Sequence, residues 1–127
     1  MSLRRYIVNK KREIREMKVL KREKSVEPNK AAIFSVIGPR RSGKTFFLYG
    51  LIKSFNLKDE DYVFVNFEEE EIKSLRRDEK VKFVEYEIEE YGKEPEFIFL
   101  DEIQNLERWN SFVYSLYEKK RYYIFIT

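Results

Sequence analysis

The sequence contains no cysteine and no histidine, and it has a single glutamine, Gln104, among 127 residues. The lack of cysteine excludes a disulfide framework and thiolate metal sites. The lack of histidine excludes Ser-His-Asp catalysis and most zinc sites. Apolar runs of membrane-spanning length are missing as well, and the N-terminus lacks the apolar core of a signal peptide. These absences predict a cytoplasmic protein that does not enter a membrane.

Charge, by contrast, is plentiful. Charged residues make up 39% of the chain, and most of them are lysine and glutamate, a bias typical of hyperthermophiles. Residues 1–30 carry eleven lysines and arginines against four glutamates, a balance of +7, whereas the rest carries fifteen against nineteen, a balance of −4. We therefore divide the chain into a basic N-terminal arm with its linker, residues 1–30, and a core, residues 31–127.

The basic arm has two interpretations. Ile7, Ile14 and Met17 form a sparse apolar stripe among charges, which predicts a mostly solvated helix. The positive charge also suits contact with nucleic acid or an anionic surface. Aromatic residues that would stack on bases do not accompany the basic ones, since Tyr6 stands alone. The solvated helix is therefore favoured, and nucleic acid is kept as an alternative partner.

Residues 38–45 match the phosphate-loop pattern G-x-x-x-x-G-K-[ST] in full. The apolar stretch 31–37 before them is expected to be a buried strand, and apolar residues at helical spacing follow at 46–55. This is the strand–loop–helix context in which the pattern binds phosphate. The expected nucleotide-binding residues are Gly38, Pro39, Arg40, Arg41, Ser42, Gly43, Lys44 and Thr45.

Each specified residue of the loop has a chemical task. Gly38 and Gly43 permit a close approach of the backbone, so that consecutive N–H groups point at phosphate oxygens. Lys44 is expected to reach the β- and γ-phosphates and so to act in catalysis, and the Thr45 hydroxyl is expected to ligate Mg²⁺. The expected cofactors are therefore a nucleotide, ATP or ADP, and Mg²⁺.

Two carboxylates, Asp101 and Glu102, end the apolar stretch that begins at Glu96. Asp101 is expected to hold Mg²⁺ through its water shell, opposite Thr45. Glu102 is expected to act as general base on an attacking water. Such a pair favours ATP hydrolysis over transfer to a substrate hydroxyl. Because the late Asn-Lys-x-Asp segment that reads guanine is absent, adenine is the better candidate base.

The remaining elements follow from periodicity. Residues 62–67 and 122–126 are expected to be strands, and an apolar helical pattern runs from Ile72 to Tyr91, with Gly92 as its stop. A further helix face begins at Trp109, which we interpret as a core anchor. The alternation of strands and helices predicts an α/β fold of three layers, with a mainly parallel sheet and helices on both faces.

The chain resembles the N-terminal P-loop domain of archaeal and bacterial AAA-type ATPases that usually carry a C-terminal DUF4143 region. The matching features are the phosphate loop, the segment Leu-Asp-Glu-Ile-Gln at 100–104, Trp109, and the closing residues 123–127. The resemblance covers about residues 31–127. It implies that the Asp101 strand and the final strand lie between the loop strand and strand 62–67. It also implies ATP, Mg²⁺ and water activation by Glu102.

That family continues past Thr127 with a polar Gly-Ser-Ser sensor, a fifth strand, a helical lid and a C-terminal domain. The resemblance therefore implies that four of five core strands are present and that the chain is a fragment. The expected partners are the nucleotide, the missing part of the same polypeptide and, through an uncovered edge of the loop strand, a second copy. The fragment alone is expected to hydrolyse ATP very slowly.

Two functions stay open at this point. The first is a Mg-dependent ATPase whose turnover drives conformational change in attached domains. The second is a nucleotide-dependent switch module with negligible turnover. A small-molecule kinase is less favoured, because it would need a lid with arginines and a substrate acid near the first helix rather than Asp101 and Glu102 together.

Overall fold

The structure is a computed structural model that describes residues 2–18, 27–39 and 43–127. Six helices, two short 3-10 helices and four strands lie within these ranges. In chain order they are α1 (Leu3–Glu16), β1 (Ile33–Ser35), α2 (Lys44–Ser54), η1 (Asp59–Asp61), β2 (Tyr62–Asn66), α3 (Glu70–Lys73), α4 (Arg77–Lys80), α5 (Phe83–Tyr91), β3 (Phe97–Asp101), η2 (Ile103–Asn105), α6 (Trp109–Glu118) and β4 (Tyr123–Ile126).

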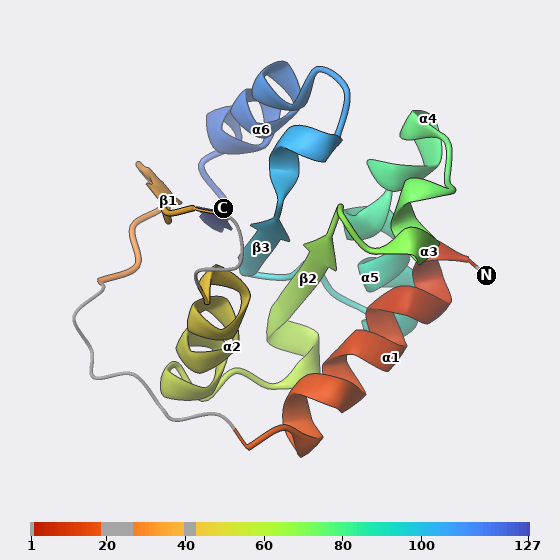
Figure 1. Cartoon of the computed structure of the whole chain (residues 1–127). Coiled ribbons are helices and arrows are strands. Elements are labelled where there is room, and N and C mark those ends of the chain that lie inside the picture. Colours follow the sequence, from red (N-terminus) through yellow and green to blue (C-terminus); the bar gives the residue numbers. More distant parts are fainter. Residues whose placement is uncertain (1, 19–26, 40–42) are drawn as a thin grey trace.

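The four strands form one sheet in the order β1-β4-β3-β2, and every neighbouring pair is parallel (Figure 1). Asn66 pairs with Asp101 at the end of β2 and β3, and Leu100 pairs with Ile126 at the end of β3 and β4. The expected α/β fold and the strand order implied by the resemblance are confirmed. Because all strands run the same way, their carboxyl ends meet along one edge.

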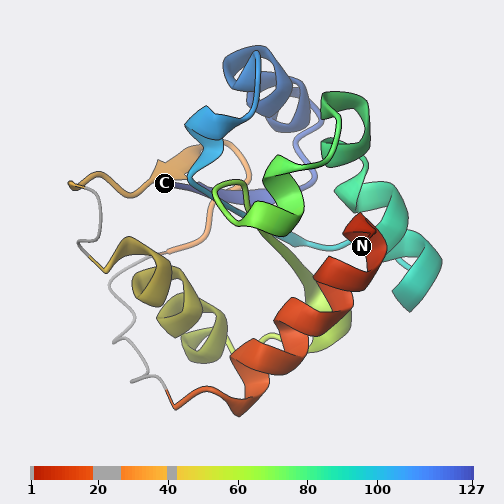
Figure 2. The same ribbon diagram turned by 45° about the vertical axis from the view of Figure 1, so that its right-hand side comes forward.

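Alternate residues of β2, β3 and β4 belong to two separate apolar clusters, one on each face of the sheet. Aliphatic side chains such as Val63 and Leu100 pack with α5, α6 and the first half of α1. Aromatic side chains such as Phe99 and Phe125, whose ring centroids lie 4.9 Å apart, pack with α2. Figure 2 shows α2 and α6 on opposite sides of the strands. The three-layer arrangement with helices on both faces is confirmed.

Strand β1 is shorter and less buried than the sequence predicts. It spans three residues instead of seven and lies at the edge of the sheet, where β4 is its neighbour. Phe34 remains 36% exposed, and the backbone N–H of Val36 donates to Ile126 O at 2.9 Å just beyond the strand. The expectation of a buried strand was wrong, because an edge strand has neighbours on one side only.

Helix α1 forms, but it is not a mostly solvated helix. Leu3, Tyr6 and Ile7 belong to the aliphatic cluster, and Ile14 belongs to the aromatic one. The helix lies against α5 and β2 (Figure 1). The expectation was wrong because apolar residues at i, i+3, i+4 and i+11 share one face, which the core covers.

The helical pattern from Ile72 to Tyr91 is divided into three short helices, α3, α4 and α5. Five consecutive charged residues, 76–80, interrupt the apolar pattern, and α4 buries none of its side chains. A helix gains most of its stability from packing an apolar face, so a continuous helix has no support there. Gly92 ends α5 in the left-handed conformation, with φ 79°, as expected.

Helix α6 agrees with the expected apolar face. Val113 and Leu116 are buried, and Trp109 packs against the aliphatic cluster, which confirms its interpretation as a core anchor. Across the described ranges, no helix is long and apolar enough to cross a membrane.

Candidate functional site

The two predicted halves of the site lie together at the carboxyl edge of the sheet. Thr45 stands in the first turn of α2, and Asp101 ends β3. The Thr45 hydroxyl donates a hydrogen bond to Asp101 Oδ2 at 2.6 Å, although 56 residues separate the two in the chain. The phosphate loop and the acidic strand end are therefore one site.

The described part of the loop contains a glycine whose conformation favours glycine, and it lines a cavity beside helix α2. Gly43 precedes α2 in the left-handed conformation, with φ 86°, which a residue with a Cβ adopts only with strain. Gly38, Pro39, Gly43 and Lys44 line a cavity of about 330 Å³. Its other lining residues are Val36, Ile37 and Phe47. Three expected binding residues, Arg40, Arg41 and Ser42, lie outside the described residues.

Lys44 spans the site. Its Nζ donates to Gly38 O at 3.0 Å and lies 3.9 Å from Glu102 Oε1. The ammonium group thus stands between the loop backbone and the second carboxylate. It provides a positive charge beside the cavity, which suits an anionic ligand.

Asp101 is fully buried, and both of its carboxylate oxygens accept hydrogen bonds from hydroxyl groups. Thr45 donates to Oδ2, and Thr127 donates to Oδ1, each at 2.6 Å. Burial raises the pKa of Asp101, and the hydrogen bonds from Thr127 and Thr45 oppose that shift. A buried carboxylate with two hydroxyl donors is held in one orientation.

Glu102 begins a sharp turn after β3, with φ 53° in the left-handed region. Its backbone N–H donates to the Thr127 hydroxyl at 2.9 Å, and its Oε2 accepts from Gln104 Nε2 at 2.5 Å. The side chain is 9% exposed. The turn therefore directs Glu102 toward Lys44, at a position separate from Asp101.

Sequence reasoning assigned no site role to Thr127 or to the side chain of Gln104. The implied strand order places the end of β4 beside Asp101, so a hydroxyl residue at that position was a usable signal for Thr127. Gln104 was quoted only as part of a motif. Its contact depends on the turn at Glu102 and on 3-10 helix η2, which the sequence pattern did not predict.

The donor set suits Mg²⁺. A hydroxyl oxygen and a carboxylate oxygen are hard ligands, and Mg²⁺ sites usually combine one or two such protein groups with phosphate and water. Within the described part of the chain, no group of three or more histidine, cysteine or acidic side chains could hold a metal by itself. Thr45 and Asp101 are the residues that would hold the ion together with a bound nucleotide.

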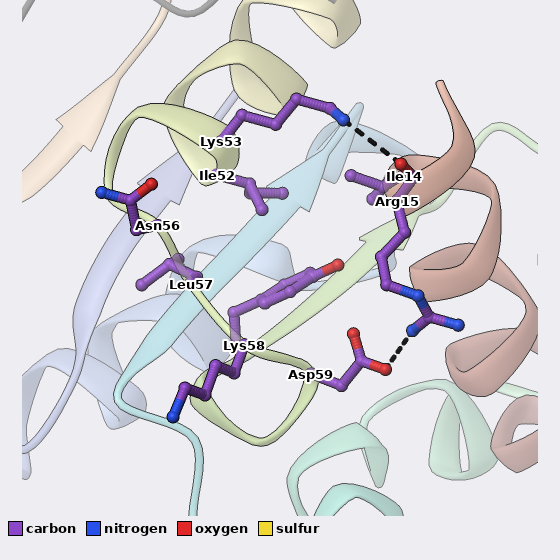
Figure 3. Close-up of a pocket in the computed structure, with 9 residues that line it drawn as sticks. Ile14, Arg15, Ile52, Lys53, Asn56, Leu57, Lys58 and Asp59 are labelled. Carbon is purple, nitrogen blue, oxygen red and sulfur yellow. Dashed lines mark hydrogen bonds and ion pairs between the residues drawn. The ribbon is translucent and has the colours of Figure 1, made fainter. Parts of the chain in front are cut away.

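A second cavity, of about 510 Å³, lies at the opposite edge of the sheet, where β2 begins (Figure 3). Ile14 and Arg15 of α1 face Ile52 and Lys53 of α2 across it, and Lys53 Nζ donates to Arg15 O at 3.5 Å. None of the predicted site residues lines this cavity. Its lining combines apolar side chains such as Ile14 and Leu57 with charged ones such as Lys53 and Asp59.

Comparisons with known proteins agree with this geometry. A family model described as an AAA domain matches residues 30–127. The chain is also 33% identical over 115 residues to the uncharacterized protein MJ1544 of Methanocaldococcus jannaschii, covering 89% of this chain and 24% of that protein. The chain thus spans about a quarter of the length of this relative. No solved structure matches the chain significantly. Since the family match covers the whole strand–loop–helix region and both carboxylates, the chain belongs to the AAA domain family, which indicates a nucleotide-binding domain.

Proposed function

We propose that this chain binds ATP together with Mg²⁺ and hydrolyses it. The observation that carries the proposal is the 2.6 Å hydrogen bond between Thr45 and Asp101, because it joins the phosphate loop to the acidic strand end. The family match supports nucleotide binding. The finer assignments below rest on the chemistry of the side chains at this edge of the sheet.

In the proposed complex, backbone N–H groups of loop 38–45 hold the phosphates at the N-terminus of α2. Lys44 leaves Gly38 O and pairs with the β- and γ-phosphate oxygens. Thr45 would offer a lone pair to a bound Mg²⁺ while its proton still reaches Asp101. A bound Mg²⁺ would supply positive charge against the phosphate oxygens. Pro39, Arg40, Arg41 and Ser42 complete the binding segment.

Glu102 is the proposed general base. One of its carboxylate oxygens takes a proton from water, whose oxygen forms a bond to the γ-phosphorus as the bond between that phosphorus and the bridging oxygen of ADP breaks. The bond from Gln104 at 2.5 Å holds the other side of the carboxylate. Asp101 keeps a separate role, because both of its oxygens are already bonded to hydroxyls.

We also propose that turnover drives conformational change in domains attached to this one. The supporting observation is the length of the relative, of which the matching region is 24%. The alternative, a nucleotide-dependent switch with negligible turnover, uses the same binding residues but does not need Glu102 as base.

The proposal is tested by calorimetry with Mg-ADP. Wild type should bind with measurable heat, and Lys44→Ala should lose most of it, because the loop then lacks its charged partner for phosphate. Lys73→Ala is the matched control, since Lys73 is exposed in α3 away from the loop. Equal binding by wild type and Lys44→Ala would show that the loop is not the nucleotide site.

A further inference from the structure

Thr127 follows β4 and bonds to four consecutive residues around the acidic pair. Its hydroxyl donates to Asp101 Oδ1 at 2.6 Å and accepts from the N–H of Glu102 at 2.9 Å. Its backbone N–H donates to Leu100 O at 3.1 Å, and its carbonyl accepts from the N–H of Ile103 at 3.2 Å. One residue therefore contacts the strand end, both carboxylate residues and the start of η2.

The conformation that these bonds hold is a costly one. Glu102 is not a glycine, and its φ of 53° lies in a region that residues with a Cβ rarely occupy. Asp101 is fully buried, so an unpaired oxygen would carry a desolvation cost. The Thr127 hydroxyl stabilises both groups, because it donates its proton to Asp101 and accepts a hydrogen bond from the N–H of Glu102.

The two hydroxyls on Asp101 come from different parts of the chain. Thr45 belongs to the phosphate loop and helix α2, whereas Thr127 directly follows strand β4 of the sheet. The Thr127 hydroxyl is therefore the one that joins Asp101 to the main chain of Glu102. Among the described residues, Thr45 bonds to Asp101 and forms no hydrogen bond with Glu102, so Thr45 does not duplicate this link.

We propose that Thr127 is a positioning residue of the nucleotide site, whose hydroxyl fixes the Asp101 carboxylate and the Glu102 turn relative to each other. The proposal rests on the proposed function, since it assigns the metal to Asp101 and the water to Glu102. Thr127 is assigned no contact with the metal or the water. It keeps the two carboxylates at the spacing that hydrolysis needs, because a shift of one would move the other.

The first test needs no nucleotide. Amide hydrogen exchange is measured at Glu102 and Ile103 in wild type, Thr127→Val and Thr127→Ser. Valine keeps the shape and removes the hydroxyl, so exchange at Glu102 should become about tenfold faster, the scale of one lost hydrogen bond. Ile103 is the internal control, because its partner is the Thr127 carbonyl, which valine retains. Serine should behave as wild type.

The second test measures Mg-ADP binding by calorimetry, with and without a chelator. Thr127→Val should weaken the Mg-dependent part of the affinity by about tenfold or more, while affinity for ADP without metal stays unchanged. Thr127→Ser should restore binding. A structural role alone would lower stability without separating the two affinities, so thermal melting is followed in parallel.

The outcomes are separable. If wild type binds no Mg-ADP, the proposed function fails, and exchange at Glu102 still decides whether the hydroxyl holds the turn. If Thr127→Val matches wild type in both exchange and Mg-dependent binding, the positioning role is wrong. Should the valine variant fail to fold, Thr127→Ala, which removes the hydroxyl together with the methyl group, replaces it under the same criteria.

Discussion

Lys11 and Glu87 form an ion pair inside the protein, with Nζ and Oε1 2.5 Å apart and side chains that are 1% and 0% exposed. The pair joins α1 to α5. The same ammonium donates to Asp59 O at 2.5 Å and lies 3.9 Å from the centre of the Tyr91 ring. Charge in the N-terminal helix is thus used for packing as well as for solvation.

Removal of one partner should be destabilising. We expect Lys11→Met to lower the free energy of unfolding by about 1–3 kcal/mol, the usual cost of a buried polar group that loses its partner, because Glu87 is then protonated and unpaired. The double variant Lys11→Met/Glu87→Leu should recover much of that loss, because no polar group of the pair is then buried. Denaturant unfolding at neutral pH measures both, with Lys73→Ala as a surface control. An unchanged midpoint in Lys11→Met would contradict the buried pair.

The pair also predicts a dependence of stability on pH. Burial raises the pKa of Glu87 from 4.5 to about 7, against the opposing effect of Lys11, and burial lowers the pKa of Lys11. Because the folded-state pKa of Glu87 is the higher one, the folded protein retains a proton that the unfolded chain has lost. This contribution to stability is complete below about pH 4.5 and is lost as the pH rises through about 7.

Glu87→Gln isolates that contribution, since glutamine resembles the protonated acid. Between about pH 5 and pH 8, wild type should lose more unfolding free energy than the glutamine variant does. Denaturant unfolding at several pH values gives the two curves. Parallel curves would mean that Glu87 does not titrate differently in the folded and unfolded states.

Substitutions of Glu102 and of Asp101 should have different effects, the first on ATP hydrolysis and the second on metal binding. Glu102→Gln should keep Mg-ADP binding and lower turnover by about 10²–10⁴, the scale of a lost general base. Asp101→Ala should instead weaken Mg-dependent binding. Phosphate release and calorimetry measure the two effects, with the exposed Glu118→Gln as control. Wild-type turnover in Glu102→Gln would place the base elsewhere.

Gln104 should affect turnover without affecting binding. Its side chain donates to Glu102 Oε2 at 2.5 Å and forms no hydrogen bond with the described residues of the phosphate loop. We expect Gln104→Leu to lower turnover by about tenfold, the scale of one hydrogen bond that holds a reacting group. The affinity for Mg-ADP should stay constant. A change in affinity with constant turnover would show that Gln104 acts on the nucleotide instead.

The N-terminal region should bind nucleic acid weakly and only at low salt. Four of its cations already contact acidic side chains: Arg4 contacts Glu90, Lys10 contacts Glu69, Lys11 contacts Glu87 and Arg15 contacts Asp59. Fewer charges are then available for phosphates, whose binding depends on released counterions. A gel shift across salt concentrations tests this. A salt-resistant, sequence-selective complex would favour the nucleic-acid interpretation.

The contact between Thr45 and Asp101 was predictable from sequence for a physical reason. A loop followed by a helix and a strand that ends in acids both reach the carboxyl edge of a parallel sheet, so their meeting follows from topology alone. The interior of the sheet was predictable for the same reason, because strands such as β3 are continuous apolar runs.

What could not be predicted depends on pairs far apart in the chain. From the sequence alone, Lys11 is interpreted as a solvated charge. Its burial becomes clear only when Glu87, 76 residues away, is known to lie beside it. The hydroxyl bonds of Thr127 depend on the left-handed turn at Glu102, which no pattern of apolar residues reports. The helical pattern breaks between α3, α4 and α5 because only some of its residues pack against the core, and that packing depends on the tertiary structure.

The burial of α1 has a practical meaning for anyone who prepares this domain. The family match begins at residue 30, yet Leu3, Tyr6 and Ile7 fill space between β2 and α5. A polypeptide cut at that match would expose an aliphatic surface and leave the Glu87 carboxylate without its cation. Its poor solubility would then reflect the choice of the first residue, and a failed nucleotide assay on it would reveal nothing about the phosphate loop.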